Sequence, residues 1–101
     1  MVKVMIFLTR KDGMGRQDFA AWWLGPHRAM AERLEGLRRM CFNLLPEGGP
    51  CDAVVEQWFD DEAAAERCYQ TRLGREVAAD SAAHVSARQR LVVEAHEFSV
   101  S

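Results

Sequence analysis

FAAWWLGPHRAMAERL, residues 19–34, is the stretch that decides the fold of this chain. At about 100° per residue on a helical wheel, its large apolar side chains gather on one side of the helix. This apolar stripe consists of Phe19, Trp23, Pro26, Met30 and Leu34, with Trp22 just off its edge. The pattern predicts an amphipathic helix that contributes more to the hydrophobic core than any other segment.

His27 falls on the border of this stripe, one turn after Trp23. Pro26 cannot donate to the carbonyl four residues earlier and disfavours helical geometry at Gly25, so we expect a kink or a restart of the helix there. Such a kink would turn the His27 imidazole towards a cavity at the end of the sheet. The alternative is a histidine at the core edge that bonds to a backbone carbonyl, since one ring nitrogen is easily satisfied locally.

Length and composition predict one domain over residues 1–101. A chain of 101 residues that is 49% hydrophobic and 28% charged can bury a core of its own. The net charge of -2, without a basic block, predicts neither a nucleic-acid partner nor an anionic membrane surface. No apolar run approaches the roughly 18 residues of a membrane span, and the N-terminus does not resemble a signal peptide. We therefore expect a cytoplasmic protein.

The residues that most often bind metals are few and scattered. They are Cys41, Cys51 and Cys68, and His27, His84 and His96. An odd number of irregularly spaced cysteines indicates a reducing compartment, without a disulfide framework or a zinc site. The histidines likewise lack the spacing of metal ligands. We expect neither a metal nor a cofactor.

Four segments have strand character and three have helical character. The predicted strands are Val2–Thr9, Leu37–Leu45, Ala53–Phe59 and Leu91–Phe98. The predicted helices run from the N-cap Gly15 to about Gly36, from Glu62 to about Gln70, and from Arg72 to about Ala83. With the last two counted as one helical layer, the order βαββαβ predicts an α+β, ferredoxin-like sandwich with a four-stranded antiparallel sheet.

Helices in this arrangement cover only one face of the sheet. Strand alternation assigns to that face Val4, Ile6, Leu8, Met40, Phe42, Leu44, Val55, Phe59, Leu91 and Val93. The opposite face then collects Lys3, Met5, Phe7, Thr9, Arg39, Cys41, Asn43, Val54, Glu56, Trp58, Val92, Glu94 and His96. Because this second set is too apolar for open water, we expect two copies of the chain to pack through it and enclose a ligand cavity. The alternative is that Arg39, Glu56 and Glu94 are only paired charges at the interface.

The opening VMIFLTRKDGMGRQDFAAWWLGPH, residues 4–27, resembles the EthD-type members of the dimeric α+β barrel superfamily. In that family a first strand and a basic turn precede Phe-x-x-x-Trp-x-x-x-His, which Phe19, Trp23 and His27 match. GLRRM (36–40), VVEQWFDD (54–61) and VEAHEF (93–98) extend the similarity over nearly the whole chain. The chain departs from the family at Arg28-Ala29, where Gly-Pro or Ala-Pro is common, and at His84, where an aromatic or aliphatic residue is usual.

This resemblance implies a homodimeric barrel with a pocket in each protomer between the sheet and the helices. Its relatives include isomerase-like enzymes and polyketide-tailoring decarboxylases and dehydratases. The wider superfamily contains monooxygenases that use neither metal nor flavin, and some distant members bind haem, for which His84 would be the axial ligand here.

Together these features predict a cofactor-independent lyase or isomerase that acts on a small, apolar, polyketide-derived aromatic or a lactone. His27 is the expected general acid/base and His84 the second proton-transfer group. The expected substrate-binding residues are Phe7, Trp23, Arg39, Cys41, Asn43 and Trp58. Dehydration, isomerisation, decarboxylation and cyclisation share an enolate, so the residues do not choose among them. The alternatives are a non-catalytic subunit that binds or stabilises such a molecule and a cofactor-free monooxygenase.

Overall fold

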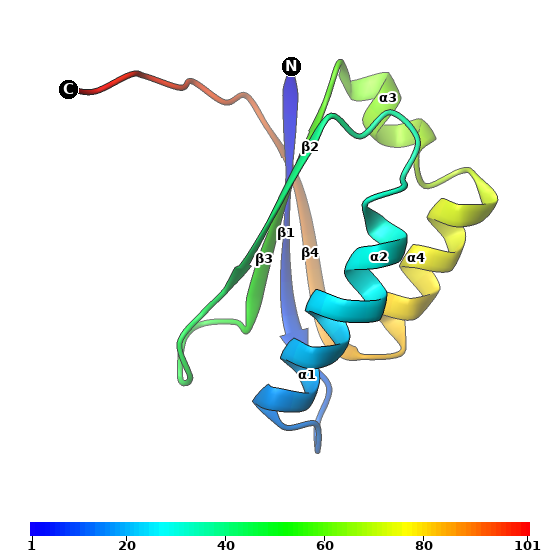
Figure 1. The fold of residues 1–101 in the computed structure, drawn as a ribbon, viewed down its shortest axis with the longest axis vertical. Helices are drawn as coiled ribbons and strands as arrows, with labels where there is room; N and C mark the ends of the chain where they lie inside the picture. Colours follow the sequence, from blue (N-terminus) through cyan, green and yellow to red (C-terminus); the bar gives the residue numbers. More distant parts are fainter.

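A four-stranded antiparallel sheet carries all the helices of the chain on one of its faces in the computed structural model, which describes residues 1–101 (Figure 1). The strands are β1 (Val2–Arg10), β2 (Arg39–Leu44), β3 (Ala53–Phe59) and β4 (Val85–Val93). The helical elements are α1 (Arg16–Trp22), the π-helical turn η1 (Trp23–His27), α2 (Arg28–Ala31), α3 (Glu62–Arg67) and α4 (Arg72–Ala82). The strand order β2-β3-β1-β4 confirms the ferredoxin-like α+β fold.

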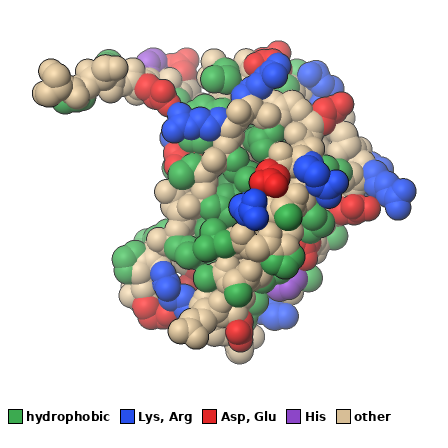
Figure 2. All heavy atoms as spheres, viewed as in Figure 1, with side chains coloured by type: hydrophobic (Ala, Val, Ile, Leu, Met, Phe, Trp, Pro, Cys, Tyr) green, Lys and Arg blue, Asp and Glu red, His purple; other side chains and the backbone are tan.

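The hydrophobic core lies between the sheet and the helices. Val4, Ile6 and Leu8 alternate along β1 and are buried against the helices. The fully buried ring of Trp23 stacks on Phe42 of β2, with 4.2 Å between ring centroids. Figure 2 shows hydrophobic side chains between the strands and the helices, with charged side chains around them. The stretch 19–34 thus contributes the largest buried side chain, as its apolar stripe predicts.

A π turn interrupts the helical run at the predicted kink. Pro26 lies inside η1 and supplies no N–H to the α-helical ladder. The N–H of Arg28 donates to the carbonyl of Trp23, five residues earlier, which is the hydrogen bond of a π turn. The Arg28 side chain donates from Nε to the carbonyl of Leu24 (2.8 Å). The family departure at Arg28 therefore serves this turn, because Arg28 satisfies a carbonyl that the turn leaves without its usual donor.

The extra residue of the π turn changes which side chains face the sheet. His27, at 5% exposure, is buried four residues after Trp23 and four residues before the buried Ala31. Pro26 is exposed, so its predicted place in the apolar stripe was wrong. A wheel drawn at 100° per residue misplaces Pro26 because a π turn holds more residues than an α turn.

The first helical run ends earlier than predicted. α2 ends at Ala31, and Gly36 lies in the turn that leads to β2, where its φ of 79° suits glycine. The N–H groups of Arg33 and Leu34 bond to carbonyls three residues earlier, so the chain tightens there and leaves the helix. Leu34 is nevertheless buried, as expected for the last residue of the stripe.

The last strand begins and ends earlier in the sequence than predicted. β4 begins at Val85, and the chain after Val93 leaves the sheet and extends away from it (Figure 1). The register pairs Lys3 with Val93 and Met5 with Leu91. Leu91 and Val93 therefore face away from the helices, and the face predicted for them was wrong. Residues 85–90 are mostly polar because β4 is an edge strand whose long side chains reach water, and the alternating apolar pattern that marks a half-buried strand is missing.

No helix covers the other face of the sheet, which we call the second face (Figure 1). It is formed by Lys3, Met5, Phe7 and Thr9 of β1, Arg39, Cys41 and Asn43 of β2, Val54, Glu56 and Trp58 of β3, and Ala87, Gln89, Leu91 and Val93 of β4. Val92, Glu94 and His96 were also predicted here. Val92 instead pairs with Val4 on the helix face, and Glu94 and His96 lie in the segment beyond β4.

The helices of this chain are too short and too polar to span a lipid bilayer.

We expect Gly74→Ala to lower the free energy of unfolding by about 3 kcal/mol, because a Cβ at this buried position would overlap the backbone oxygen of Cys68. Gly15→Ala is the control, since nothing lies within 4 Å of a Cβ at Gly15. Its effect should stay below about 1 kcal/mol. Urea unfolding followed by tryptophan fluorescence measures both, and equal stabilities of the two variants would contradict the predicted close approach.

Candidate active site

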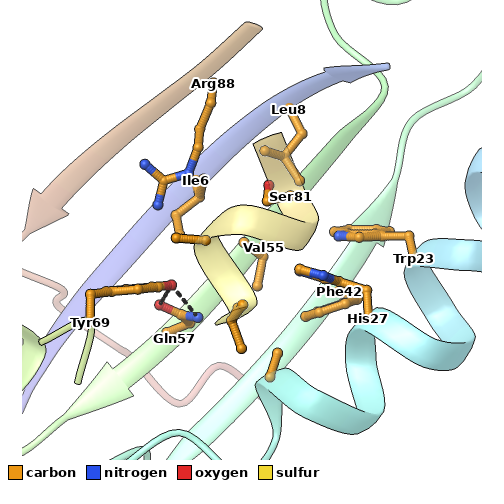
Figure 3. A pocket seen from close by; sticks show the side chains of 13 residues that line it. Ile6, Leu8, Trp23, His27, Phe42, Val55, Gln57, Tyr69, Ser81 and Arg88 are labelled. Carbon is orange, nitrogen blue, oxygen red and sulfur yellow. Dashed lines mark hydrogen bonds between the residues drawn. The ribbon is translucent and has the colours of Figure 1, made fainter. Parts of the chain in front are cut away.

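A cavity lies between the helices and the sheet beside Trp23 and His27 (Figure 3). The space that it offers is about 20 Å³, enough for one or two water molecules. Ile6, Leu8, Phe42, Val55 and Val77 are among its apolar walls, and its polar groups come from His27, Gln57, Tyr69, Ser81 and Arg88. An apolar cavity with a few polar groups is typical of a small-molecule site.

His27 is held in this cavity by Asp80 of α4. Its Nδ1 lies 2.9 Å from Asp80 Oδ2, and the indole N–H of Trp22 donates to the same oxygen (3.0 Å). A carboxylate only accepts hydrogen bonds, so this contact places the His27 proton on Nδ1. Nε2 is then the basic nitrogen, and it has no hydrogen-bond partner in the chain.

The environment of His27 keeps its imidazole neutral. Burial lowers the pKa of His27 below the ordinary value of 6.5, and nearby His84 lowers it further. The hydrogen bond to Asp80 and its charge act in the opposite direction, but less strongly. A neutral imidazole with a free Nε2 can accept a proton from a ligand at pH 7.

His84 lies in the same cluster but outside the cavity. Its ring stacks on Trp22, with 3.9 Å between centroids, and its Nδ1 donates to the backbone oxygen of Asp80 (2.7 Å). The two histidines singled out from the sequence thus meet at Asp80, and only His27 lines the cavity.

The sheet divides the predicted substrate-binding residues into two groups. Trp23 lines the cavity, whereas Phe7, Arg39, Cys41, Asn43 and Trp58 lie on the second face. Successive residues of a strand point to opposite sides, so these five side chains are separated from His27 by the sheet. The expected pocket with Trp23, Trp58 and Phe7 as common walls is therefore not formed within one chain.

The polar residues of the second face bond to one another. Glu56 pairs with Lys3 and accepts a hydrogen bond from Asn43 (3.1 Å). The hydrogen bond from Lys3 is the main reason that the pKa of Glu56 lies below its usual value. Trp58 is only 6% exposed, because the Arg39 guanidinium lies 4.4 Å from its ring centroid and Lys3 approaches it as well.

Cysteine and metal chemistry have little support in this arrangement. Burial raises the pKa of the Cys68 thiol to about 11, so Cys68 is not a nucleophile at neutral pH. No three side chains of His, Cys, Asp or Glu are arranged to hold a metal ion.

Asp80 is a site residue that was not predicted from the sequence. It lies three residues after the buried Val77 and four before His84. This spacing could have predicted an acidic side chain on the inner side of α4, next to His84. Its contact with His27 spans 53 residues, and no local pattern shows that pairing.

Gln57 was also missed. It is a buried polar residue, and its Nε2 donates to the hydroxyl of Tyr69 (3.3 Å).

The model of the EthD domain family matches residues 11–87, about three quarters of the sequence. The chain belongs to the EthD family. The EthD resemblance noted above for Phe19, Trp23 and His27 is thereby confirmed. No protein with a curated description matches the sequence of this EthD domain.

Solved structures similar to this EthD domain share its fold at low sequence identity. An EthD family protein from Bacillus halodurans has 19% identity and a TM-score of 0.82, over 95% of this chain and 99% of that one. SnoaB, a cofactor-independent oxygenase from Streptomyces nogalater, has 15% identity and a TM-score of 0.73, over 96% and 94%. A dimeric ferredoxin-like protein of unknown function from Thermobifida fusca has 14% identity and a TM-score of 0.76, over 91% and 88%. What these proteins share with this chain is the fold.

We expect acid to destabilise the EthD domain in part through His27. Because burial lowers the pKa of His27, the unfolded chain binds the His27 proton more readily than the folded chain. The contribution of His27 to stability is therefore complete above about pH 6.5 and is lost as the pH falls through its lower folded value. His27→Asn, whose amide can still donate to Asp80, should unfold with a shallower pH dependence between pH 7 and 5. Parallel stability curves in urea titrations would contradict the inferred pKa direction.

Proposed function

We propose that this EthD domain is a cofactor-independent enzyme, a lyase or isomerase, that moves a proton on a small, flat, mostly apolar molecule. Its general acid/base is His27, and Asp80 is the residue that positions His27. The observation that supports this proposal is the His27 ring itself, bonded to Asp80 through Nδ1 and free at Nε2 in the wall of an apolar cavity. The substrate class is a polyketide-derived aromatic or a lactone with a hydrogen next to a carbonyl, and the helices and sheet must move apart to admit it, because the space beside His27 is about 20 Å³.

In this mechanism Nε2 of His27 removes a proton from the carbon next to the carbonyl, and the substrate becomes an enolate. Asp80 holds the correct tautomer beforehand and stabilises the imidazolium afterwards. The same Nε2–H then returns the proton, either to another carbon in an isomerisation or to a leaving group in a dehydration. His84 has no direct substrate contact in this scheme, because it does not line the cavity.

An oxygenase without a cofactor is the second candidate, and the similarity in fold to the cofactor-independent oxygenase SnoaB favours it. O₂ oxidises enolates and phenolates, so the same removal of a proton by His27 would prepare the substrate. Oxygen consumption in the presence of a candidate substrate, recorded with an oxygen electrode, distinguishes this route from a lyase or isomerase.

The proposal predicts that the protein exchanges the acidic hydrogens of the model ketone 1-tetralone in D₂O. Asp80→Asn should lower the exchange rate about a hundredfold. An asparagine amide at position 80 can donate to Nδ1 and move the His27 proton to Nε2, the nitrogen that must be free. His27→Asn should abolish exchange. Mass spectrometry of the recovered ketone measures the incorporated deuterium.

His96→Asn is the matched control, since His96 is exposed in the segment beyond β4 and pairs only with Glu94. Its exchange rate should equal that of the unmodified protein. Exchange that survives in His27→Asn would exclude His27 as the base. Saturable binding of 1-tetralone without any exchange would favour the non-catalytic alternative, in which the cavity sequesters its ligand.

We further propose that two copies of the chain pack through their second faces. No helix covers this face, and it contains Met5, Phe7, Leu91 and Val93 beside paired charges. The segment beyond β4 extends from the body with Phe98 and Val100 exposed, which is where a second copy would shield them. Some of the structures with the same fold are described as dimeric.

Leu91→Arg should convert this dimer into single subunits, because the new charge would be buried between two copies. Leu24→Arg is the matched control: Leu24 and Leu91 are 41% and 40% exposed, and Leu24 lies on the helix side. Sedimentation equilibrium at micromolar concentration should give twice the 11.5 kDa chain mass for the unmodified protein and for Leu24→Arg. A folded single subunit in the unmodified protein would refute the dimer.

A further inference from the structure

The cavity contains a buried hydrogen-bond donor that the protein does not use. Trp23 is fully buried, and its indole Nε1 has no acceptor in the chain. An indole N–H only donates, and a buried donor without a partner destabilises the fold. The neighbouring Trp22 shows the usual arrangement, since its Nε1 donates to Asp80 (3.0 Å).

Packing holds the Trp23 ring in this position. The ring stacks with Phe19 of α1 and with Phe42 of β2, with centroid separations of 5.9 Å and 4.2 Å. Because the ring is fully buried and packs against two other rings, it has no room to turn towards another acceptor. Trp23 lines the cavity together with His27, which lies four residues further along the helical run (Figure 3).

We propose that the N–H of Trp23 donates to a carbonyl oxygen of the ligand that this cavity binds. The inference rests on the proposed function, because it takes the cavity, widened on binding, as the substrate site, and it adds the group that binds the carbonyl oxygen. The ligand is a flat ketone or lactone that places its oxygen at Trp23 Nε1 and the adjacent carbon at His27 Nε2.

The two roles support each other chemically. Removal of a proton by His27 transfers negative charge to the carbonyl oxygen, and a hydrogen bond from a fixed donor strengthens as that charge develops. Ile6, Leu8 and Val55 form apolar walls of this cavity. Water exclusion by these apolar walls makes the interaction stronger than it would be in solvent.

Nuclear magnetic resonance of the ¹⁵N-labelled chain tests this donor directly. The three indole N–H signals are assigned by single Trp→Phe substitutions, and the protein is titrated with 1-tetralone and with tetralin, which has the same ring system without the oxygen. The Trp23 proton should move downfield with 1-tetralone and change little with tetralin. The Trp58 signal, from the second face, should be unaffected by both. Equal shifts with the two probes, or no shift at saturating 1-tetralone, would overturn the proposal, as would a failure of 1-tetralone to bind.

Substitution of Trp23 by benzothienylalanine provides an independent test, because it keeps the ring shape and replaces the N–H with sulfur. The affinity for 1-tetralone should fall about fivefold to tenfold, the loss expected for one hydrogen bond, with tetralin affinity unchanged. The same substitution at Trp58 is the control. Unchanged affinity for 1-tetralone in a folded Trp23 variant would contradict the inference.

The outcomes separate this inference from the proposed function. A ketone-dependent shift of the Trp23 signal without deuterium exchange would support the donor and refute catalysis by His27. Exchange that depends on His27, with no ketone-dependent shift at Trp23, would refute the donor alone.

Discussion

The missing backbone N–H of Pro26 is the constraint on which the rest of the site depends. A helical run that cannot complete its α ladder at this point takes an extra residue into one turn, and the π turn η1 results. Trp23 and His27 then both face the sheet, whereas Pro26 remains at the surface. π turns are frequent at functional sites, and here the turn brings a large aromatic ring and a titratable ring to the same cavity.

Asp80 connects the two halves of the fold. It belongs to α4, yet its carboxylate accepts hydrogen bonds from Trp22 and His27 of the first helical run. The orientation and tautomer of His27 therefore depend on the packing of α4 against that run. Burial and Asp80 act on the pKa of His27 in opposite directions, and burial has the larger effect. The basic nitrogen is available at neutral pH for this reason.

The two faces of the sheet carry different groups of residues. The helix face carries the cavity with Trp23 and His27, and the second face carries Trp58 under Lys3 and Arg39. Trp23 and Trp58, which were both expected to bind the substrate, are thus separated by the thickness of the sheet. In the proposed dimer, the second face would form the interface, and each copy would keep its own cavity between the helices and the sheet.

The sequence by itself determined the ferredoxin-like order of elements, the inward face of β1, the break at Pro26 and the membership of the EthD family. These features follow from local rules: alternation in strands, the missing donor of proline, and a short motif around His27. The extent of β4, the separation of Trp58 from Trp23 and the partnership of His27 with Asp80 were decided only by the tertiary structure. An edge strand needs no apolar pattern, and a hydrogen bond between residues 53 positions apart forms only when the folded chain brings them together.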